Sequence, residues 1–289
     1  MRDGLTHQQS VETAFQQTAQ CENSRAGLLK QEILRILPGR LLVAYRFFRT
    51  GDWWSALLFL LERDLDVPFA VRFQIIRRLY VISMHVPCEH LQAEIIRFIR
   101  TVLSLPRGMP GFIVECGCFK GGGTAKFSIV AKLTGRKLIV FDTFEGIPAH
   151  SENHGRNIWG GPIEFSIGDY YGSLEEVEAS VRKFGEIETC EFVKGMFQDT
   201  LPLFRNTVAA AYLDVDLASS TRSCLQHLWP LLTPGGFLFS HDGHLPLVLE
   251  VITDEHFWLD QLGASMPKIH HSKEHKLIWM QKRPIANGC

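Results

Sequence analysis

The sequence predicts an α/β fold in which a mostly parallel sheet with crossover helices follows an all-helical N-terminal region. Three observations carry this prediction. From residue 26 to residue 105 the apolar side chains recur at helical spacing, without strand-like alternation. After Pro106, Gly108 and Pro110, short apolar runs alternate with helical stretches, which is typical of a parallel sheet. Near the C-terminus, two short runs flank a polar turn and predict a hairpin.

Composition sets the broad class of the protein. With 46% hydrophobic and 21% charged residues, the 289-residue chain is neither disordered nor a coiled-coil rod. Its 30 basic and 31 acidic residues give a net charge of −1, so we expect no nucleic-acid partner. The longest apolar run, 53–61, is flanked by charges and falls short of the ~20 residues that a membrane span needs. It predicts a core helix, with a membrane-surface helix as the alternative because Trp53 and Trp54 lie near basic residues.

The chain divides into three parts by texture. Residues 1–25 are polar and Gln-rich and predict a flexible arm, residues 26–106 predict a helical subdomain that begins its last helix at Pro87, and residues 107–289 predict the sheet domain. The seven cysteines show no zinc pattern and no C-x-x-C pair, and the N-terminus shows no apolar leader. We therefore expect reduced thiols and a cytoplasmic protein.

The elements of the sheet domain follow from local signals. Ser173 and Glu176 form a capping-box pattern that opens a helix running to about residue 184. The hairpin is expected to close the sheet edge, with residues 272–274 as its turn. Strands are expected near residues 112–116, 137–141, 190–193, 208–214, 237–240, 268–271 and 275–280.

A glycine-rich turn between the first strand and its helix is the strongest local signal. Gly117 removes a side chain where the chain bends, and residues 121–123 are glycines that expose backbone N–H groups at a helix start. Lys126 stands where the third glycine of a dinucleotide fingerprint would fall, which disfavours a nicotinamide-dependent oxidoreductase. Asp142 ends the next strand, where a carboxylate can accept both ribose hydroxyls of a nucleoside cofactor. The alternative is an ordinary βα turn with a capping aspartate.

Longer stretches resemble one family. Glu115, Gly117 and Gly121 form an E-x-G-x-x-x-G pattern similar to the first motif of class I S-adenosylmethionine-dependent methyltransferases. The string FDTFEGIP at 141–148 resembles the macrocin O-methyltransferase family. Three further stretches do so in the same order: 114–123, 194–202, and 213–217 leading to 234–236. The resemblance covers about residues 85 to 280. It implies a class I methyltransferase Rossmann-like sheet, which here follows the N-terminal helical subdomain that the apolar spacing predicts. It also implies S-adenosylmethionine as methyl donor, a divalent cation usually described as magnesium, and a sugar or other hydroxyl acceptor.

The resemblance also implies roles for individual residues. Asp214 would be a metal ligand or a base. The next acidic pair of the family is represented here by His241 and Asp242, which is a departure from the pattern. Residues 217–221 also depart from the family at the acceptor side. The implied cofactor-binding residues are Glu115, Gly117, Gly121 and Asp142, together with Met196 and Phe197 near the adenine.

The acidic cluster has a physical basis of its own. Asp214 ends one predicted strand and His241 and Asp242 end another, so the three can meet at the carboxyl edge of the sheet. We expect Asp214 and His241 to be catalytic, and Asp214, His241 and Asp242 to bind a divalent cation. Carboxylates suit magnesium, whereas the imidazole shifts the preference towards manganese, iron or zinc. Alternatively no metal binds and His241, with an ordinary pKa of about 6.5, takes the acceptor proton. In the plainest interpretation these residues only cap strands and loops.

The predicted function is therefore an S-adenosylmethionine-dependent O-methyltransferase that acts on a hydroxyl of a small-molecule acceptor. The alternative is a non-catalytic cofactor-binding or scaffold protein with a degenerate acceptor site. The segment 149–162, with His150, His154, Arg156 and Trp159, is either a lid over the acceptor or a surface insertion. A homo-oligomer is compatible with the sequence, and the N-terminal helices would cover the acceptor or form a dimer contact.

Overall fold

The computed structural model describes residue 41, residues 52–271 and residues 275–284. The predicted flexible arm, nearly all of residues 26–51 and the predicted turn at 272–274 lie outside the described residues.

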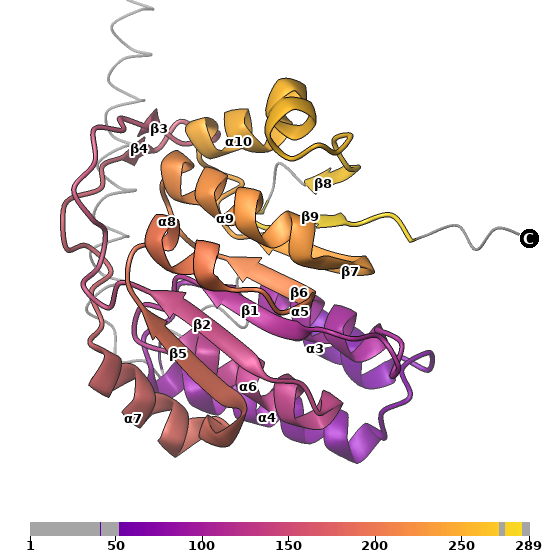
Figure 1. Ribbon diagram of the computed structural model, residues 1–289. Coiled ribbons are helices and arrows are strands. Elements are labelled where there is room, and N and C mark those ends of the chain that lie inside the picture. Colours follow the sequence, from indigo (N-terminus) through magenta and orange to yellow (C-terminus); the bar gives the residue numbers. More distant parts are fainter. Residues whose placement is uncertain (1–40, 42–51, 272–274, 285–289) are drawn as a thin grey trace, which may run out of the picture.

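A seven-stranded sheet forms the centre of the molecule (Figure 1). Its strand order is β5-β2-β1-β6-β7-β9-β8. The first five strands of this order are parallel, and β9 pairs antiparallel with both β7 and β8. The strands are β1 (Phe112–Cys116), β2 (Leu138–Asp142), β5 (Cys190–Lys194), β6 (Val208–Leu213), β7 (Leu232–Ser240), β8 (Ile269–His271) and β9 (Ile278–Gln281), with a separate ribbon of β3 (Gly155–Arg156) and β4 (Pro162–Ile163).

The predicted α/β class and the closing hairpin are confirmed. The clearest difference lies in β7, which begins at Leu232 rather than near 237. Val208 of β6 pairs with Leu232, yet Ala210, two residues on, pairs with Phe237, so β7 carries extra residues in a bulge. Gly235, with φ +85°, supplies the left-handed backbone that this bulge needs. The run Pro234-Gly235-Gly236 therefore lies within β7, and the apolar pattern alone predicts the start of this strand too late.

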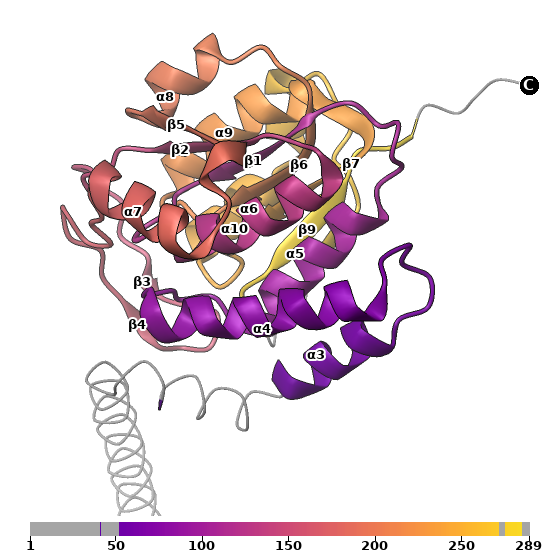
Figure 2. The same cartoon turned by 90° about the horizontal axis from the view of Figure 1, so that it is seen from below.

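Helices cover both faces of the sheet (Figure 2). Helices α4 to α7 share one apolar cluster with the first face, and α9 and α10 share another with the second. The helices are α3 (Asp52–Leu61), α4 (Phe69–His85), α5 (Gln92–Ser104), α6 (Gly122–Thr134), α7 (Leu174–Phe184), α8 (Phe197–Thr200), α9 (Ala218–Leu231) and α10 (Pro246–Thr253), with short turns at Ile187–Thr189, Leu201–Leu203 and Phe257–Gln261. The predicted capping box is present at α7: Glu176 N–H donates to Ser173 Oγ, and Ser173 N–H donates to Glu176 Oε2.

The N-terminal helices share a core with the sheet. The ring of Phe98 in α5 lies 4.6 Å from that of Phe127 in α6, 5.2 Å from Tyr212 in β6 and 5.3 Å from Phe239 in β7. All four residues are fully buried. The change from helical to mixed texture at residue 106 is therefore a change of element type within continuous packing, and the domain boundary there stays a prediction.

Helix α5 begins later than the proline suggested, at Gln92 instead of Pro87. The buried carboxylate of Asp52 in α3 accepts hydrogen bonds from Gln92 N at 3.3 Å and Ala93 N at 3.1 Å. Glu94 Oε2 accepts another from Leu91 N at 2.8 Å. These acceptors satisfy the first N–H groups of the helix. Residues 87–91 consequently stay outside the helix, in the loop that reaches the carboxyl edge of the sheet.

Helix α3, predicted as a core helix, buries only one side. Ala56 and Phe59 are buried against α4 and α5, whereas Trp54, Leu58 and Leu61 are more than half exposed. No helix in the described parts of the chain has the length and apolar character that crossing a bilayer requires.

Candidate functional site

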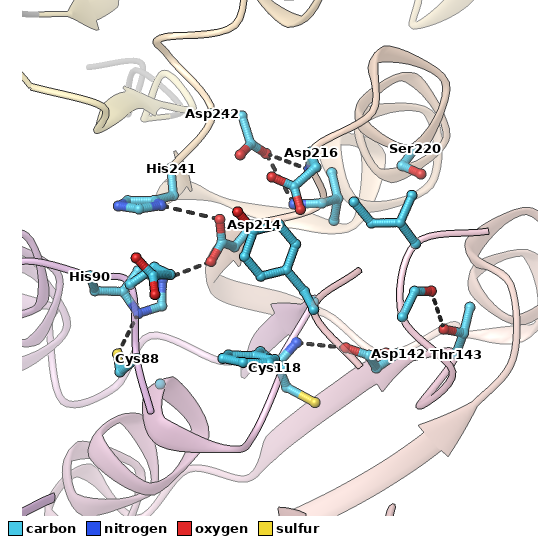
Figure 3. Close-up of a pocket in the computed structure, with 18 of the residues that line it drawn as sticks. Cys88, His90, Cys118, Asp142, Thr143, Asp214, Asp216, Ser220, His241 and Asp242 are labelled. Atoms are coloured by element: carbon cyan, nitrogen blue, oxygen red, sulfur yellow. Dashed lines mark hydrogen bonds and ion pairs between the residues drawn. The ribbon is translucent and has the colours of Figure 1, made fainter. Parts of the chain in front are cut away.

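A cavity of about 950 Å³, open to solvent, lies at the carboxyl ends of the parallel strands (Figure 3). It is centred on β1 and β6, where the order of the strands reverses, the usual ligand position in open α/β sheets. Its lining includes Cys88, His90, Gly117, Cys118, Gly122, Gly123, Asp142, Thr143, Met196, Phe197, Asp214, Asp216, His241, Asp242 and His244.

The glycine turn owes much of its composition to contacts within the protein. Gly117 has φ +83°, and a Cβ there would lie 2.0 Å from the backbone oxygen of Asp214. A Cβ on Gly122 would lie 2.9 Å from Cys88 Cβ, and one on Gly123 would lie 2.7 Å from Glu115 Oε1. The glycines therefore let the end of β6, the loop before α5 and a strand side chain approach the turn closely.

Asp142 joins the turns that follow β1 and β2. Its Oδ2 accepts a hydrogen bond from Cys118 N at 2.7 Å, and its Oδ1 accepts one from Phe144 N at 2.7 Å. Each carboxylate oxygen keeps a further lone pair for a ligand. Met196 and Phe197 line the same cavity at the start of α8. The fold thus brings together four of the six predicted cofactor residues.

Two predicted cofactor residues lie behind the cavity wall. Neither Glu115 nor Gly121 is among the described residues that line the cavity. The side chain of Glu115 is directed towards α6, against Gly123, and the residue is 1% exposed. Burial raises the pKa of Glu115 to about 8. Its contact with the cofactor remains a prediction, and in this structure it packs beneath the turn.

A buried chain of acids and imidazoles forms the floor of the cavity. Asp214 Oδ1 lies 3.1 Å from His241 Nδ1, and Asp214 Oδ2 lies 3.0 Å from His90 Nε2 (Figure 3). The other ring nitrogen of His241, Nε2, lies 3.0 Å from Glu94 Oε2. Asp214 is the most accessible member, with a side chain 25% exposed against 3% for His241.

The charge states of these acids and imidazoles follow from their contacts. Burial alone would lower the pKa of His241, but the carboxylates of Asp214 and Glu94 outweigh it and raise that pKa to about 9. Burial alone would raise the pKa of Asp214, but the charge and hydrogen bonds of the two histidines hold it well below the ordinary value. Near neutral pH His241 is therefore protonated between two carboxylates, and an imidazolium has no lone pair to accept a further proton.

Asp214, Asp216 and Asp242 form an oxygen-only cluster with one ligand atom of each within 4.8 Å of the others. Asp242 is completely buried, and its Oδ2 accepts hydrogen bonds from Val215 N at 3.0 Å and Asp216 N at 3.2 Å. Its Oδ1 is buried and has no hydrogen-bond partner among the described residues. Burial and the charge of Asp214 raise the pKa of Asp242 to about 7. Three converging carboxylates with one orphaned oxygen fit a hard divalent cation.

Sequence reasoning missed three members of this site, namely His90, Glu94 and Cys88. The run Pro87-Cys88-Glu89-His90 is dense in titratable residues, but it was treated as the start of a helix. Asp216 is a further residue outside the predicted cluster, although its D-x-D spacing with Asp214 is a usable signal.

The segment 149–162 makes contacts with the rest of the domain near both of its ends. Glu152 accepts hydrogen bonds from Ala218 N at 2.7 Å and Ser219 N at 2.9 Å at the start of α9. The ring of Trp159 stacks on His244 at 5.8 Å. A second groove of about 1680 Å³ lies beside the first cavity and shares Pro148, Met196 and Ser220 with it. Residues 149–152 of the segment line this second groove, whereas the described lining of the first cavity includes no residue of 149–162.

Solved structures support the fold. The O-methyltransferase NovP superposes with a TM-score of 0.54 at 23% identity, covering 65% of this chain and 78% of that one. The calicheamicin methyltransferase CalS11 superposes with a TM-score of 0.51 at 18% identity, covering 80% of this chain and 90% of that one.

Curated relatives match a little over half of the chain. A tetracenomycin-C 4'-O-methyltransferase of Streptomyces olivaceus, whose described substrate carries an 8-linked dimethoxy-rhamnosyl group, is 31% identical over 166 residues, 54% of this chain and 61% of its own length. The mycinamicin III 3''-O-methyltransferase of Micromonospora griseorubida is 27% identical over 169 residues, 56% of this chain and 65% of its own. The chain thus spans just under two thirds of the length of these relatives. The profile of the family described as Macrocin-O-methyltransferase (TylF) matches residues 91–270, and the chain belongs to that family.

Proposed function

We propose that this protein is an S-adenosylmethionine-dependent O-methyltransferase that acts on a hydroxyl of a small-molecule acceptor, in particular on a sugar unit of a natural product. The observation that carries the proposal is the strand-end cavity in which Asp142 of β2 and Asp214 after β6 face one space. The tetracenomycin-C 4'-O-methyltransferase, whose described substrate carries a rhamnosyl group, and the mycinamicin III 3''-O-methyltransferase support the proposed reaction.

The cavity fits a nucleoside cofactor at its β1 and β2 side. Asp142 has lone pairs for two ribose hydroxyls, the bare turn at Gly117 admits the methionine part, and Met196 and Phe197 provide apolar contacts for the adenine. When bound, S-adenosylmethionine supplies an electrophilic methyl group. The protein itself holds the methyl group and the acceptor oxygen in line and excludes water.

Asp214 is the group that we assign to the acceptor hydroxyl. It is anionic, it is the most exposed member of the buried chain, and it borders the cavity. Its carboxylate accepts the hydroxyl hydrogen bond and directs a lone pair of the acceptor oxygen towards the cofactor. His241 and His90 hold the two oxygens of Asp214 in place, so we assign them positioning roles. The second groove, bordered by the 149–162 segment, then receives the rest of the acceptor.

For the divalent cation we propose Asp214, Asp216 and Asp242 as ligands. His241 is engaged at both ring nitrogens, whereas Asp216 offers a third carboxylate close to the other two. An oxygen-only set matches magnesium or manganese. When bound, the ion supplies positive charge beside the acceptor oxygen.

The metal assignment predicts which variant loses the ion. In chelator-treated protein titrated with Mn²⁺ and followed by electron paramagnetic resonance, Asp216→Asn is expected to weaken binding about tenfold or more, because one of three anionic ligands is lost. Asp260→Asn, which removes an exposed carboxylate elsewhere on the surface, should leave the affinity unchanged. If Asp216→Asn binds Mn²⁺ like the parent protein, the ion is held by a different set or not at all.

Calorimetry tests the proposed function directly. S-adenosylmethionine should bind the parent protein, and Asp142→Ala should weaken that binding about 100-fold, since each hydrogen bond to a charged group contributes about 1.5–3 kcal/mol. Circular dichroism of Asp142→Ala checks that the fold survives the loss of the two hydrogen bonds that join the turns. The bound protein is then offered a panel of deoxyhexose glycosides, and transferred methyl is detected by mass spectrometry.

Each outcome separates the candidates. Cofactor binding without transfer to any acceptor would favour the scaffold alternative, and binding of a nicotinamide cofactor instead would favour the oxidoreductase. Absence of any cofactor binding would contradict the proposal. The cytoplasmic location and a homo-oligomeric state stay predictions.

A further inference from the structure

Cys88 lies at the edge of the cofactor cavity, and the proposed reaction does not use its thiol. Its Sγ lies 3.1 Å from Nδ1 of His90, and His90 in turn is paired through Nε2 with Asp214 at 3.0 Å (Figure 3). A thiol, an imidazole and a carboxylate in contact in this order are the arrangement by which proteins activate a cysteine nucleophile.

A lysine ammonium group approaches the same sulfur from helix α6. Lys126 of α6 is fully buried, and its Nζ lies 3.4 Å from Cys88 Sγ. A buried ammonium requires a nearby anion, and a thiolate meets this requirement. The close approach depends on Gly122, where a Cβ would lie 2.9 Å from Cys88 Cβ, so the cysteine packs on the first turn of α6. The partial positive charge of a helix N-terminus adds to the same effect.

The sulfur differs electrostatically from those of Cys116, Cys118 and Cys190. Burial alone would raise the pKa of Cys88, but Lys126 and His90 outweigh it and lower that pKa to about 6. Burial raises the pKa of Cys190 to about 12 and raises those of Cys116 and Cys118 well above the ordinary value. Cys88 and Cys190 are both partly exposed, so accessibility does not account for the contrast.

We propose that Cys88 is a covalent modification site, a nucleophilic thiolate held by His90 and Lys126 that reacts with soft alkylating electrophiles and with peroxides. With an alkyl halide, a sulfur–carbon bond forms as the halide leaves with its electron pair. With a peroxide, a sulfur–oxygen bond forms, the oxygen–oxygen bond breaks and hydroxide leaves, so that sulfur is oxidised by two electrons to the sulfenic acid. Because Cys88 lines the same cavity as Gly117 and Asp142, the adduct occupies space that the cofactor needs.

The rate of alkylation tests the proposal on the full-length protein. Iodoacetamide is added between pH 5 and pH 9, and the modification of each cysteine peptide is followed by mass spectrometry. At pH 7, Cys88 is expected to react at least about 100-fold faster than Cys190, with a rate that is half-maximal near pH 6. A Cys88 rate no greater than that of Cys190, or one that rises only above pH 8, would overturn the proposal.

Two variants test the cluster separately. Lys126→Met removes the buried cation and His90→Asn removes the imidazole, and each should move the half-maximal pH of Cys88 upward. Using both guards against one variant failing to fold, which circular dichroism checks. If folded versions of both keep the parent midpoint, His90 and Lys126 do not activate the sulfur and the proposal is wrong.

A protection experiment tests whether Cys88 and the cofactor occupy the same part of the cavity. It is the one experiment on Cys88 that rests on the proposed function. Saturating S-adenosylhomocysteine should slow alkylation of Cys88 about tenfold or more while leaving Cys190 unaffected. If calorimetry shows that this ligand binds and Cys88 is not protected, the shared-cavity part of the proposal is overturned. If the ligand does not bind, the proposed function fails, whereas the pH profile still decides the reactivity of Cys88.

Discussion

Replacing Gly117 by alanine is expected to lower the free energy of unfolding by about 4 kcal/mol or more and to abolish cofactor binding. The new Cβ would lie 2.0 Å from the backbone oxygen of Asp214 and 2.9 Å from its carbonyl carbon. Both of these atoms belong to the end of a central strand, so no flexible side chain can move aside. The positive φ of +83° adds a conformational penalty. Any relaxation displaces Asp214 and the turn together, which couples stability to the site.

Gly135 provides the matched control for this variant. It also has a positive φ, +66°, at the end of α6, but a Cβ there would meet no atom of the described residues within 4 Å. Gly135→Ala should therefore cost only the backbone term, about 1–2 kcal/mol. Urea denaturation of the three proteins measures the difference. Equal losses for the two variants would show that the contact with Asp214 is not what makes glycine necessary at position 117.

Replacing Asp214 by asparagine is expected to reduce kcat for methyl transfer by about 100-fold or more, with little change in the affinity for S-adenosylmethionine. The amide keeps the size of the side chain but removes the anion that we assign to the acceptor hydroxyl and the cation. Asp214 lies across the cavity from Asp142, so cofactor contacts are spared (Figure 3). The measurement combines single-turnover kinetics, using the acceptor that the glycoside panel identifies, with calorimetry of the cofactor.

The control and the contrary outcomes are equally specific. Asp260→Asn removes an exposed carboxylate, 67% accessible, and should leave kcat unchanged. Unchanged turnover in Asp214→Asn would assign the chemistry to another carboxylate. A parallel loss of cofactor binding would instead show that the two histidines, deprived of the carboxylate charge, disturb the whole cavity.

The sheet could be predicted from local patterns because burial leaves a record in the sequence. Runs such as 112–114 and 138–141 are continuously apolar, since helices cover both sides of the sheet, and glycines or prolines lie nearby at 110–111, 117 and 135. The carboxyl-end positions of Asp142 and Asp214 followed from the same reasoning. The predicted start of β7, near residue 237 rather than at Leu232, shows the limit of this reasoning, because the bulge at Gly235 conceals the first half of the strand.

The site depended on contacts that no local pattern records. Glu94 and His241 are 147 positions apart, yet they pair at 3.0 Å because α5 packs on the face below β6 and β7. The same packing brings His90 to Asp214 and Cys88 to Lys126. It also places His241, which the sequence predicts as a base, between two carboxylates that keep it protonated. A resemblance by position could not reveal this change.

The sequence by itself determined the α/β class, most strands, the family and the positions of Asp142 and Asp214, because burial periodicity and turn chemistry act over a few residues. Only the tertiary structure decided which side chains meet in the cavity. It placed Glu115 behind the wall, made Gly117 necessary through a backbone contact, and gathered Asp216 into the carboxylate cluster. Charge states and ligand sets depend on distances of about 3 Å between distant segments, and those distances are set by strand order and helix packing.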